Sequence, residues 1–226
     1  MSRAGIVSAA CALACLFARP ASAQVYIGRD VPHAGSIEAS GGVLWNQAYD
    51  FGSANATLTR NPGTGTGPFT LFTSGTGVDA GIGVQARVGV FLSRALSVEG
   101  GVQYSRPVLS STLSNDFEQA DSTTATETLT RYVFDGTVLY HFGKGKAMPF
   151  VAAGGGYIRE LHDGYGVVET GNEFHAGAGL KYWFSGGKHR LGLRAEAGAM
   201  SRSGGVDFDD TRRTVMTACG GLAYLF

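Results

Sequence analysis

The sequence predicts an all-β protein, an eight-stranded antiparallel up-and-down transmembrane β-barrel. Two observations lead to this prediction. Apolar and polar residues alternate through eight separate segments, which is the pattern of strands with one apolar face. The motif Tyr-x-Phe also ends three of those segments, at Phe142, Phe184 and Phe226, at equal intervals of 42 residues. Such an interval fits one hairpin unit, with a tight turn at one end and a longer loop at the other.

Residues 1–23 have the composition of a secretory signal peptide. Arg3 is followed by an uncharged apolar run over 6–17, which is too short to cross a bilayer as a helix. An Ala-x-Ala sequence at 21–23 then supplies a cleavage site of small residues. Lipid attachment at Cys15 is the alternative, and the cramped apolar run before that cysteine favours cleavage instead.

Residues 24–34 contain a proline and lack alternation, so we expect a periplasmic lead-in before a barrel over 35–226. Loss of the leader leaves a net charge of about −2, which gives no electrostatic reason to expect nucleic acid. Cys219 is then the one remaining cysteine, so neither an internal disulfide nor a cysteine-rich zinc site is possible. We expect no cofactor and no metal.

The first four alternating segments are 36–49, 78–92, 96–109 and 129–142. Their apolar faces include Trp45, Val84, Val102 and Phe134. Their polar faces include Glu38, Arg87, Glu99 and Asp135. The pattern is clearest in 78–92, where eight apolar residues follow a strict period of two.

The last four segments are 150–161, 173–184, 190–202 and 212–226. Their apolar faces include Tyr157, Leu180, Leu193 and Leu222, and the first of the four is the weakest in phase. A β-sandwich would also alternate, but its polar face would tolerate Lys and Glu freely. Here that face is rich in glycine with few charges, as expected for the narrow interior of a small barrel.

The connections between the segments alternate in length. Short turns fall near 93–94, 143–148 and 185–189, whereas long loops fall near 50–77, 110–128, 162–172 and 203–211. With the amino terminus in the periplasm, every short turn lies on the periplasmic side and every long loop lies outside. The Gly-, Thr- and Ser-rich composition of 53–77 predicts a mobile loop.

The closing segment, which ends in Tyr224 and a terminal Phe226, resembles the last strand of bacterial outer-membrane barrels. The region 35–226 as a whole resembles the small OmpA/OmpX-like eight-stranded barrels. The resemblance implies the outer membrane of a Gram-negative bacterium. It also implies that the barrel assembly machinery recognises Tyr224 and Phe226.

Charged residues on the polar faces are expected to meet inside the barrel, because an unpaired charge there is costly. The predicted interior network comprises Glu38, Arg87, Glu99, Asp135, Lys181, Arg194 and Glu196. Arg87 and Glu99 are the expected pair, since the short turn between their strands brings them near register. The network is predicted to be structural, and a narrow polar path for water or small ions is the alternative.

Some barrels of this kind modify lipids, using a His and a Ser at the outer rim. His162 is the one rim candidate here, no His-x-Ser occurs, and His141 and His175 are expected to point inward. We therefore predict no enzyme, with a lipid-modifying activity as an alternative.

The predicted function is structural, with surface contacts made by the outer loops to a partner that the sequence does not identify. Asp207, Asp209 and Asp210 lack the spacing of a dedicated calcium loop. Three outward arginines at the extracellular ends of their strands are predicted to contact lipopolysaccharide phosphates, since guanidinium groups bind phosphate well. These residues are Arg106, Arg159 and Arg212. Ordinary snorkelling of charged side chains at the rim is the alternative.

Overall fold

The structure is a computed structural model that describes residues 32–59, 67–143, 145–164, 166–184, 190–206 and 211–226. All regular structure in these ranges is β-strand. A helix long and apolar enough to cross a membrane is not found among them.

The described part of the chain contains eleven strands. They are β1 (Ile37–Asn46), β2 (Tyr49–Leu58), β3 (Phe69–Val78), β4 (Gly81–Phe91), β5 (Leu96–Ser105), β6 (Val108–Ser114), β7 (Thr123–His141), β8 (Ala147–His162), β9 (Val168–Trp183), β10 (Leu191–Gly204) and β11 (Arg213–Leu225).

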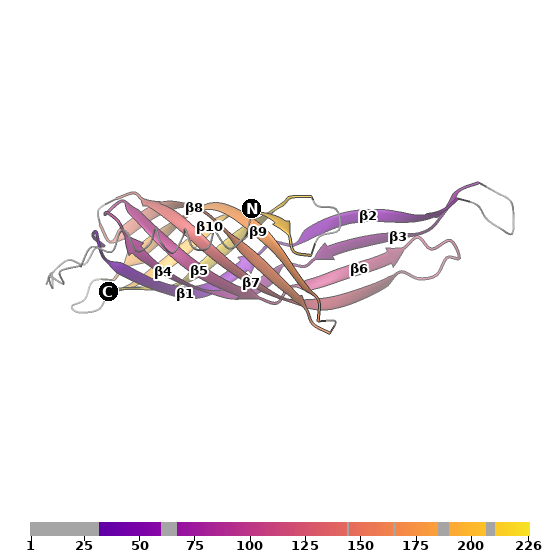
Figure 1. The fold of residues 1–226 in the computed structure, drawn as a ribbon, viewed down its shortest axis with the longest axis horizontal. Coiled ribbons are helices and arrows are strands. Elements are labelled where there is room, and N and C mark those ends of the chain that lie inside the picture. The colour runs from indigo at the N-terminus through magenta and orange to yellow at the C-terminus, as the bar shows by residue number, and fades with distance from the viewer. Residues whose placement is uncertain (1–31, 60–66, 144, 165, 185–189, 207–210) are drawn as a thin grey trace, which may run out of the picture.

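Eight of these strands close into an antiparallel barrel in the order β1, β4, β5, β7, β8, β9, β10 and β11. Pairing of β1 with β11 and of β7 with β8 completes the ring. Each of the eight predicted segments contains one barrel strand, so the predicted fold class is confirmed (Figure 1).

Three of the predicted strands are interrupted and continue beyond the barrel. The interruptions lie at 47–48, 79–80 and 106–107, and Pro107 has no N–H to give to a ladder. Above them β2 pairs with β3, β3 with β6, and β6 with residues 123–128 of β7, which gives a four-stranded sheet, here called the extension. It projects from one end of the barrel, and the carboxyl terminus lies at the opposite end (Figure 1).

The prediction of long loops over 50–77 and 110–128, with a mobile loop over 53–77, is therefore wrong for most of their described length. The Ser- and Thr-rich composition indicated a loop, but threonine is β-branched and favours strands. Each of these segments also finds a neighbour to complete its hydrogen-bond ladder. Residues 60–66 lie outside the described residues.

Large apolar side chains cover the outside of the barrel. Val88 is 61% exposed and Phe134 is 50% exposed, whereas Lys181 and Glu99 are almost completely buried. A soluble sandwich would have the opposite arrangement, so an apolar solvent is needed outside. The three Tyr-x-Phe motifs add edge-to-face ring pairs near the short-turn end, with centroids 5.0, 5.8 and 4.8 Å apart. Such aromatic girdles are typical of a membrane interface.

Apolar side chains close the barrel interior near each end. At the short-turn end the lower plug consists of Phe91, Met148, Trp183, Ala223 and Leu225. At the end that carries the extension the upper plug consists of Tyr49, Val78, Leu129, Met200, Val206 and Val215. The buried charged residues Arg87, Glu99 and Asp135 lie between these two plugs.

Candidate functional site

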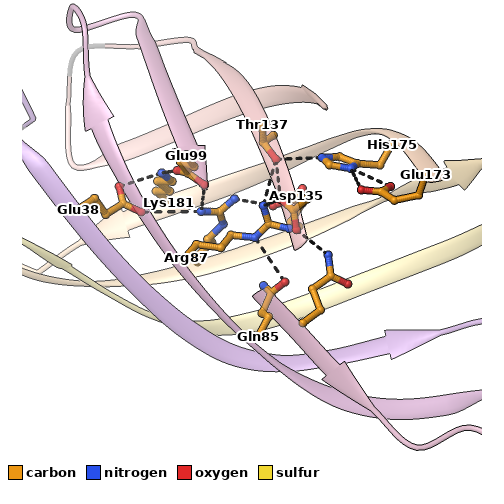
Figure 2. A network of polar contacts seen from close by, with 12 residues as sticks. Glu38, Gln85, Arg87, Glu99, Asp135, Thr137, Glu173, His175 and Lys181 are labelled. Atoms are coloured by element: carbon orange, nitrogen blue, oxygen red, sulfur yellow. Dashed lines mark hydrogen bonds and ion pairs between the residues drawn. The ribbon is translucent and has the colours of Figure 1, made fainter. Parts of the chain in front are cut away.

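The barrel interior contains three clusters of polar side chains. The lower cluster, next to the lower plug, joins Glu38, Glu99, Lys181, Arg194 and Glu196. Lys181 Nζ donates to Glu38 Oε2 and to Glu99 Oε1, both at 2.8 Å, and Arg194 Nη1 donates to Glu99 Oε2 at 2.6 Å (Figure 2). Lys181 is thus held between two carboxylates with no exposed side-chain surface.

Arg194 extends the lower cluster upward along β10. Its Nη2 donates to Glu196 Oε2 at 2.8 Å, while Nη1 lies 3.8 Å from Glu38 Oε1. The predicted network residues Glu38, Glu99 and Lys181 are therefore brought together with the two predicted residues of β10, Arg194 and Glu196.

The middle cluster is centred on Asp135. Arg87 Nη1 donates to Asp135 Oδ1 at 2.8 Å, and Gln103 donates to Asp135 Oδ2 at 3.1 Å (Figure 2). Gly101 provides the space, since a Cβ there would lie 2.9 Å from Asp135 Oδ2.

The expected Arg87–Glu99 pair is wrong. In the hairpin of β4 and β5, Arg87 lies opposite Gly101, and Glu99 lies opposite Gly89. Because of this offset of two residues, Arg87 reaches over Gly101 to Asp135 on β7, and Glu99 faces partners across the lumen. Glu99 consequently bonds to Lys181 and Arg194.

His175 links the middle cluster to Glu173. Its Nδ1 lies 2.9 Å from Glu173 Oε1, and its Nε2 lies 3.0 Å from Thr137 Oγ1 (Figure 2). Thr137 Oγ1 also donates to Asp135 Oδ1 at 3.0 Å, so one hydrogen-bonded row runs from Glu173 through His175 and Thr137 to Asp135.

The row of Glu173, His175 and Thr137 has the order of an acid, a base and a hydroxyl nucleophile. Thr137 is only 1% exposed, however, and its proton is directed to Asp135 rather than to His175. The arrangement satisfies buried polar groups and gives no access to a substrate. His175 itself is inward-pointing, as predicted, and it fits because Gly154 has no side chain.

The upper cluster was not predicted from the sequence. Glu160, which is completely buried, accepts hydrogen bonds from Arg131 Nε at 2.5 Å, from Arg202 Nη2 at 2.8 Å and from Val206 N at 2.7 Å. The Tyr49 hydroxyl oxygen accepts from Arg131 at 2.9 Å and from Arg202 at 2.5 Å. Tyr49 therefore ties the first residue of the extension to strands on two sides of the barrel mouth.

Two signals could have revealed the upper cluster. Arg131 and Arg202 lie on the polar faces of their segments, in phase with the residues of the predicted network. Glu160 was not predicted because the alternation of β8 is interrupted by Gly154–Gly156, and Tyr49 because it is the last residue of its predicted segment, next to a predicted loop.

The three clusters leave little open space in the lumen. A cavity of about 30 Å³ lies at mid-height, with room for about two water molecules. Its lining includes Gln85, Gln103, Glu196 and Cys219, so Cys219 faces the interior. Above and below it, the fully buried Glu160 and Lys181 and the two apolar plugs fill the described part of the barrel.

At the rim that carries the extension, His162 lies between two carboxylates. Its Nδ1 is 3.2 Å from Glu127 and its Nε2 is 3.8 Å from Glu169. Within the described ranges no group of three His, Cys, Asp or Glu side chains is arranged to hold a metal ion. Asp207, Asp209 and Asp210 lie outside those ranges.

The three predicted rim arginines lie at this same end of the barrel and are exposed. Arg106 forms an ion pair with Asp163, and the Arg212 guanidinium lies 5.7 Å from the Phe174 ring centroid. Arg159 is on the outward face of β8, close to the rim. All three guanidinium groups are thus placed where the outside of the barrel leaves its apolar belt.

The outward face of the extension is built from small polar residues. Cross-strand pairing places them in three rows, here called the hydroxyl face: Gly77, Ser110 and Thr126; Ser53, Gly75, Thr112 and Thr124; Asn55, Thr73 and Ser114. Thr112 and Thr124 share a hydrogen bond of 2.9 Å, and Thr73 donates to Asn55 at 3.0 Å. The base of the face is acidic, because Asp50 lies opposite Gly77 in the first row and Asp79 accepts a hydrogen bond of 3.3 Å from Ser110.

Replacing Lys181 with methionine tests the lower cluster. The variant leaves Glu38 and Glu99 buried without the ammonium group between them, so K181M should lose about 3–5 kcal/mol of unfolding free energy. Adding E38Q removes one of the stranded charges and should recover at least half of the loss. Urea unfolding in lipid vesicles, followed by the gel shift between folded and unfolded forms, measures both. A loss below about 1 kcal/mol for K181M would contradict the assignment.

Comparisons with known proteins support the fold. Neither a protein-family model nor a curated protein sequence matches the chain. Among solved structures, the outer-membrane protein OprG from Pseudomonas aeruginosa matches 88% of this chain and 99% of its own with a TM-score of 0.56, at 10% identity. Neisserial surface protein A covers 85% of this chain and 98% of its own, with a TM-score of 0.48 and 11% identity. The chain has the fold of the small eight-stranded outer-membrane β-barrels.

Proposed function

We propose that this protein is a non-enzymatic outer-membrane protein of a Gram-negative bacterium with a structural and surface-interaction role. The observation that carries the proposal is the combination of a closed lumen with a β-sheet that projects from the rim. The filled interior stabilises the barrel, and the extension provides a surface for contacts with other molecules. The proposal includes export by cleavage of residues 1–23 and a periplasmic lead-in over 24–34, of which residues 1–31 lie outside the described residues.

The closed lumen argues against the alternative of a narrow pore. A path for ions would have to break the lower and upper clusters and displace the lower and upper plugs. The lipid-modifying alternative is weakened by the surroundings of His162, whose two ring nitrogens face carboxylates. A hydroxyl nucleophile would need to occupy one of those positions.

Two measurements on the unaltered protein separate these functions. In planar bilayers we expect no unitary currents, because charged side chains fill the interior. Mass spectra of lipid A from cells with and without the protein are expected to be identical. Discrete conductance steps would favour the pore, and a mass change in lipid A would favour the enzyme.

The proposed surface role includes contact with lipopolysaccharide at the rim. Arg106, Arg159 and Arg212 are exposed where the barrel leaves its apolar belt. An arginine near the interface costs only about 0–1 kcal/mol, compared with about 2–4 kcal/mol at mid-membrane, so these positions are tolerated. The outer leaflet presents phosphate groups there, which guanidinium binds by charge-assisted hydrogen bonds.

Replacing all three arginines with glutamine tests this contact. R106Q/R159Q/R212Q should still fold, since each side chain is on the surface, but should retain several-fold less lipopolysaccharide during purification. Replacement of three periplasmic-end cations, R94Q/K146Q/R190Q, is the matched control and should leave retention unchanged. Equal retention in both triple variants would mean that the rim arginines do not bind the phosphates.

We also propose that the carboxyl-terminal strand is the assembly signal. Tyr224 and Phe226 point outward, with Phe226 62% exposed and the two rings 4.8 Å apart. In this position the rings are available to an assembly factor before membrane insertion.

Deleting Phe226 should therefore lower the yield in the outer membrane several-fold, while the same variant should refold in vitro with nearly unchanged stability. The comparison of cellular yield with refolding separates recognition from folding. F142A, which removes an equivalent ring from β7's end, is the control. If both variants reach wild-type levels in the outer membrane, Phe226 is not a signal.

A further inference from the structure

The outward surface of β5, β6 and β7 changes its chemistry in a fixed order along the barrel axis. At mid-height Val102 lies opposite Phe134. Above them the rings of Tyr104 and Tyr132 lie 5.3 Å apart. The column thus begins in the apolar belt and passes through an aromatic pair at its upper margin.

Above the aromatic pair the column becomes charged and then uncharged. Arg106 forms its ion pair with Asp163, which also accepts a hydrogen bond of 3.2 Å from Thr130. Beyond Val108 the hydroxyl face begins with Asp50 and Asp79 at its base, and its second and third rows carry no charge and no large apolar side chain. From Tyr104 to Thr112 the chain rises about 27 Å along the strand.

This order matches the layers of the outer leaflet itself, from acyl chains through the interface and the phosphates to the saccharide of lipopolysaccharide. We propose that the hydroxyl face is a binding surface for the saccharide portion of the surrounding lipopolysaccharide. The inference rests on the outer-membrane placement proposed above, but it does not depend on the rim arginines.

The chemistry of the face favours a saccharide as its partner. Serine and threonine hydroxyl groups both donate and accept hydrogen bonds, as sugar hydroxyl groups do. The three rows contain no Lys or Arg that could bind a phosphate. They also contain no aromatic or large aliphatic residue that could anchor a protein partner. The face also continues the lipid-contacting side of the barrel, so lipids of the same leaflet surround it.

The centre of the face is open. A Cβ placed at Gly75 would meet no atom within 4 Å. Because glycine exposes the strand surface between Ser53 and Thr112, a ring can lie directly against the backbone there.

The opposite face of the same strands has a different composition. It carries Phe72, Leu109 and Leu113 together with one hydroxyl pair, Thr76 and Ser111, at 3.1 Å. The polar character is therefore a property of the outward face and not of the extension as a whole. The Thr76–Ser111 pair has the same hydroxyl groups on the opposite face, so it serves as a control.

Threonine methyl NMR tests the proposal directly. The full chain, labelled at threonine methyl groups, is placed in nanodiscs of phospholipid, of lipid A, or of lipopolysaccharide that carries its saccharide. Resonances of Thr112, Thr124 and Thr126 should shift only in the third lipid, while that of Thr76 should not. Equal shifts in lipid A and in saccharide-bearing lipopolysaccharide, or equal shifts on both faces, would overturn the proposal.

A pair of valine variants provides a second measurement. T112V/T124V keeps the side-chain shape and the strand preference but removes two hydroxyl groups. Its retention of saccharide-bearing lipopolysaccharide, relative to lipid A, should fall roughly five- to tenfold, the change expected for about one net hydrogen bond. The control T76V/S111A should leave the ratio unchanged, and an unchanged ratio in T112V/T124V would overturn the proposal.

These outcomes are distinguishable from failure of the rim-arginine contact. R106Q/R159Q/R212Q should lower retention of lipid A and of saccharide-bearing lipopolysaccharide together, because both carry the phosphates. The hydroxyl-face variant should change their ratio alone. A partner protein on the hydroxyl face would give shifts that depend on that protein and not on the saccharide, which would also overturn the proposal.

Discussion

The fold depends on pairing charge in a space too narrow for water to solvate it. The lower, middle and upper clusters together contain six carboxylates and five lysine or arginine side chains. His175 lies between Glu173 and Thr137 and completes the middle cluster. Because an isolated charge in such a place costs several kcal/mol, the strands that bear these groups must meet in one register. A shift by one residue would turn every inward charge toward the lipid.

The barrel could be predicted from the sequence because its two faces obey different rules. Val84, Val88 and Phe134 are outward because lipid demands apolar surface, and that demand leaves a period of two in the chain. The identity of the ion pairs could not be predicted in the same way. Glu99 bonds to Lys181 and Arg194 across the lumen, and a partner 82 or 95 residues away leaves no local pattern.

The extension illustrates a second limit of the sequence. A segment such as Thr123–Thr128 has no apolar face, because it faces water on both sides, so the alternation that identified the barrel strands is missing. What holds it is its ladder with β6, which depends on the register of the whole hairpin. The role of Tyr49 could not be predicted for a different reason. Its buried position arises only when β7, β8 and β10 converge on it.

The continuity of β7 has a mechanical consequence. Its 19 residues run without a break from the extension into the barrel, whereas the chain paths of the other three extension strands are interrupted at the rim. A sideways force on the extension would therefore bend the sheet about the three interruptions, with β7 as the stiff member of the hinge. Arg131, Asp135 and Thr137 all lie on that strand, so the strand that would carry the load is also fastened to the interior by ion pairs and hydrogen bonds. The extension would thus bend at the rim, and β7 would anchor it to the barrel.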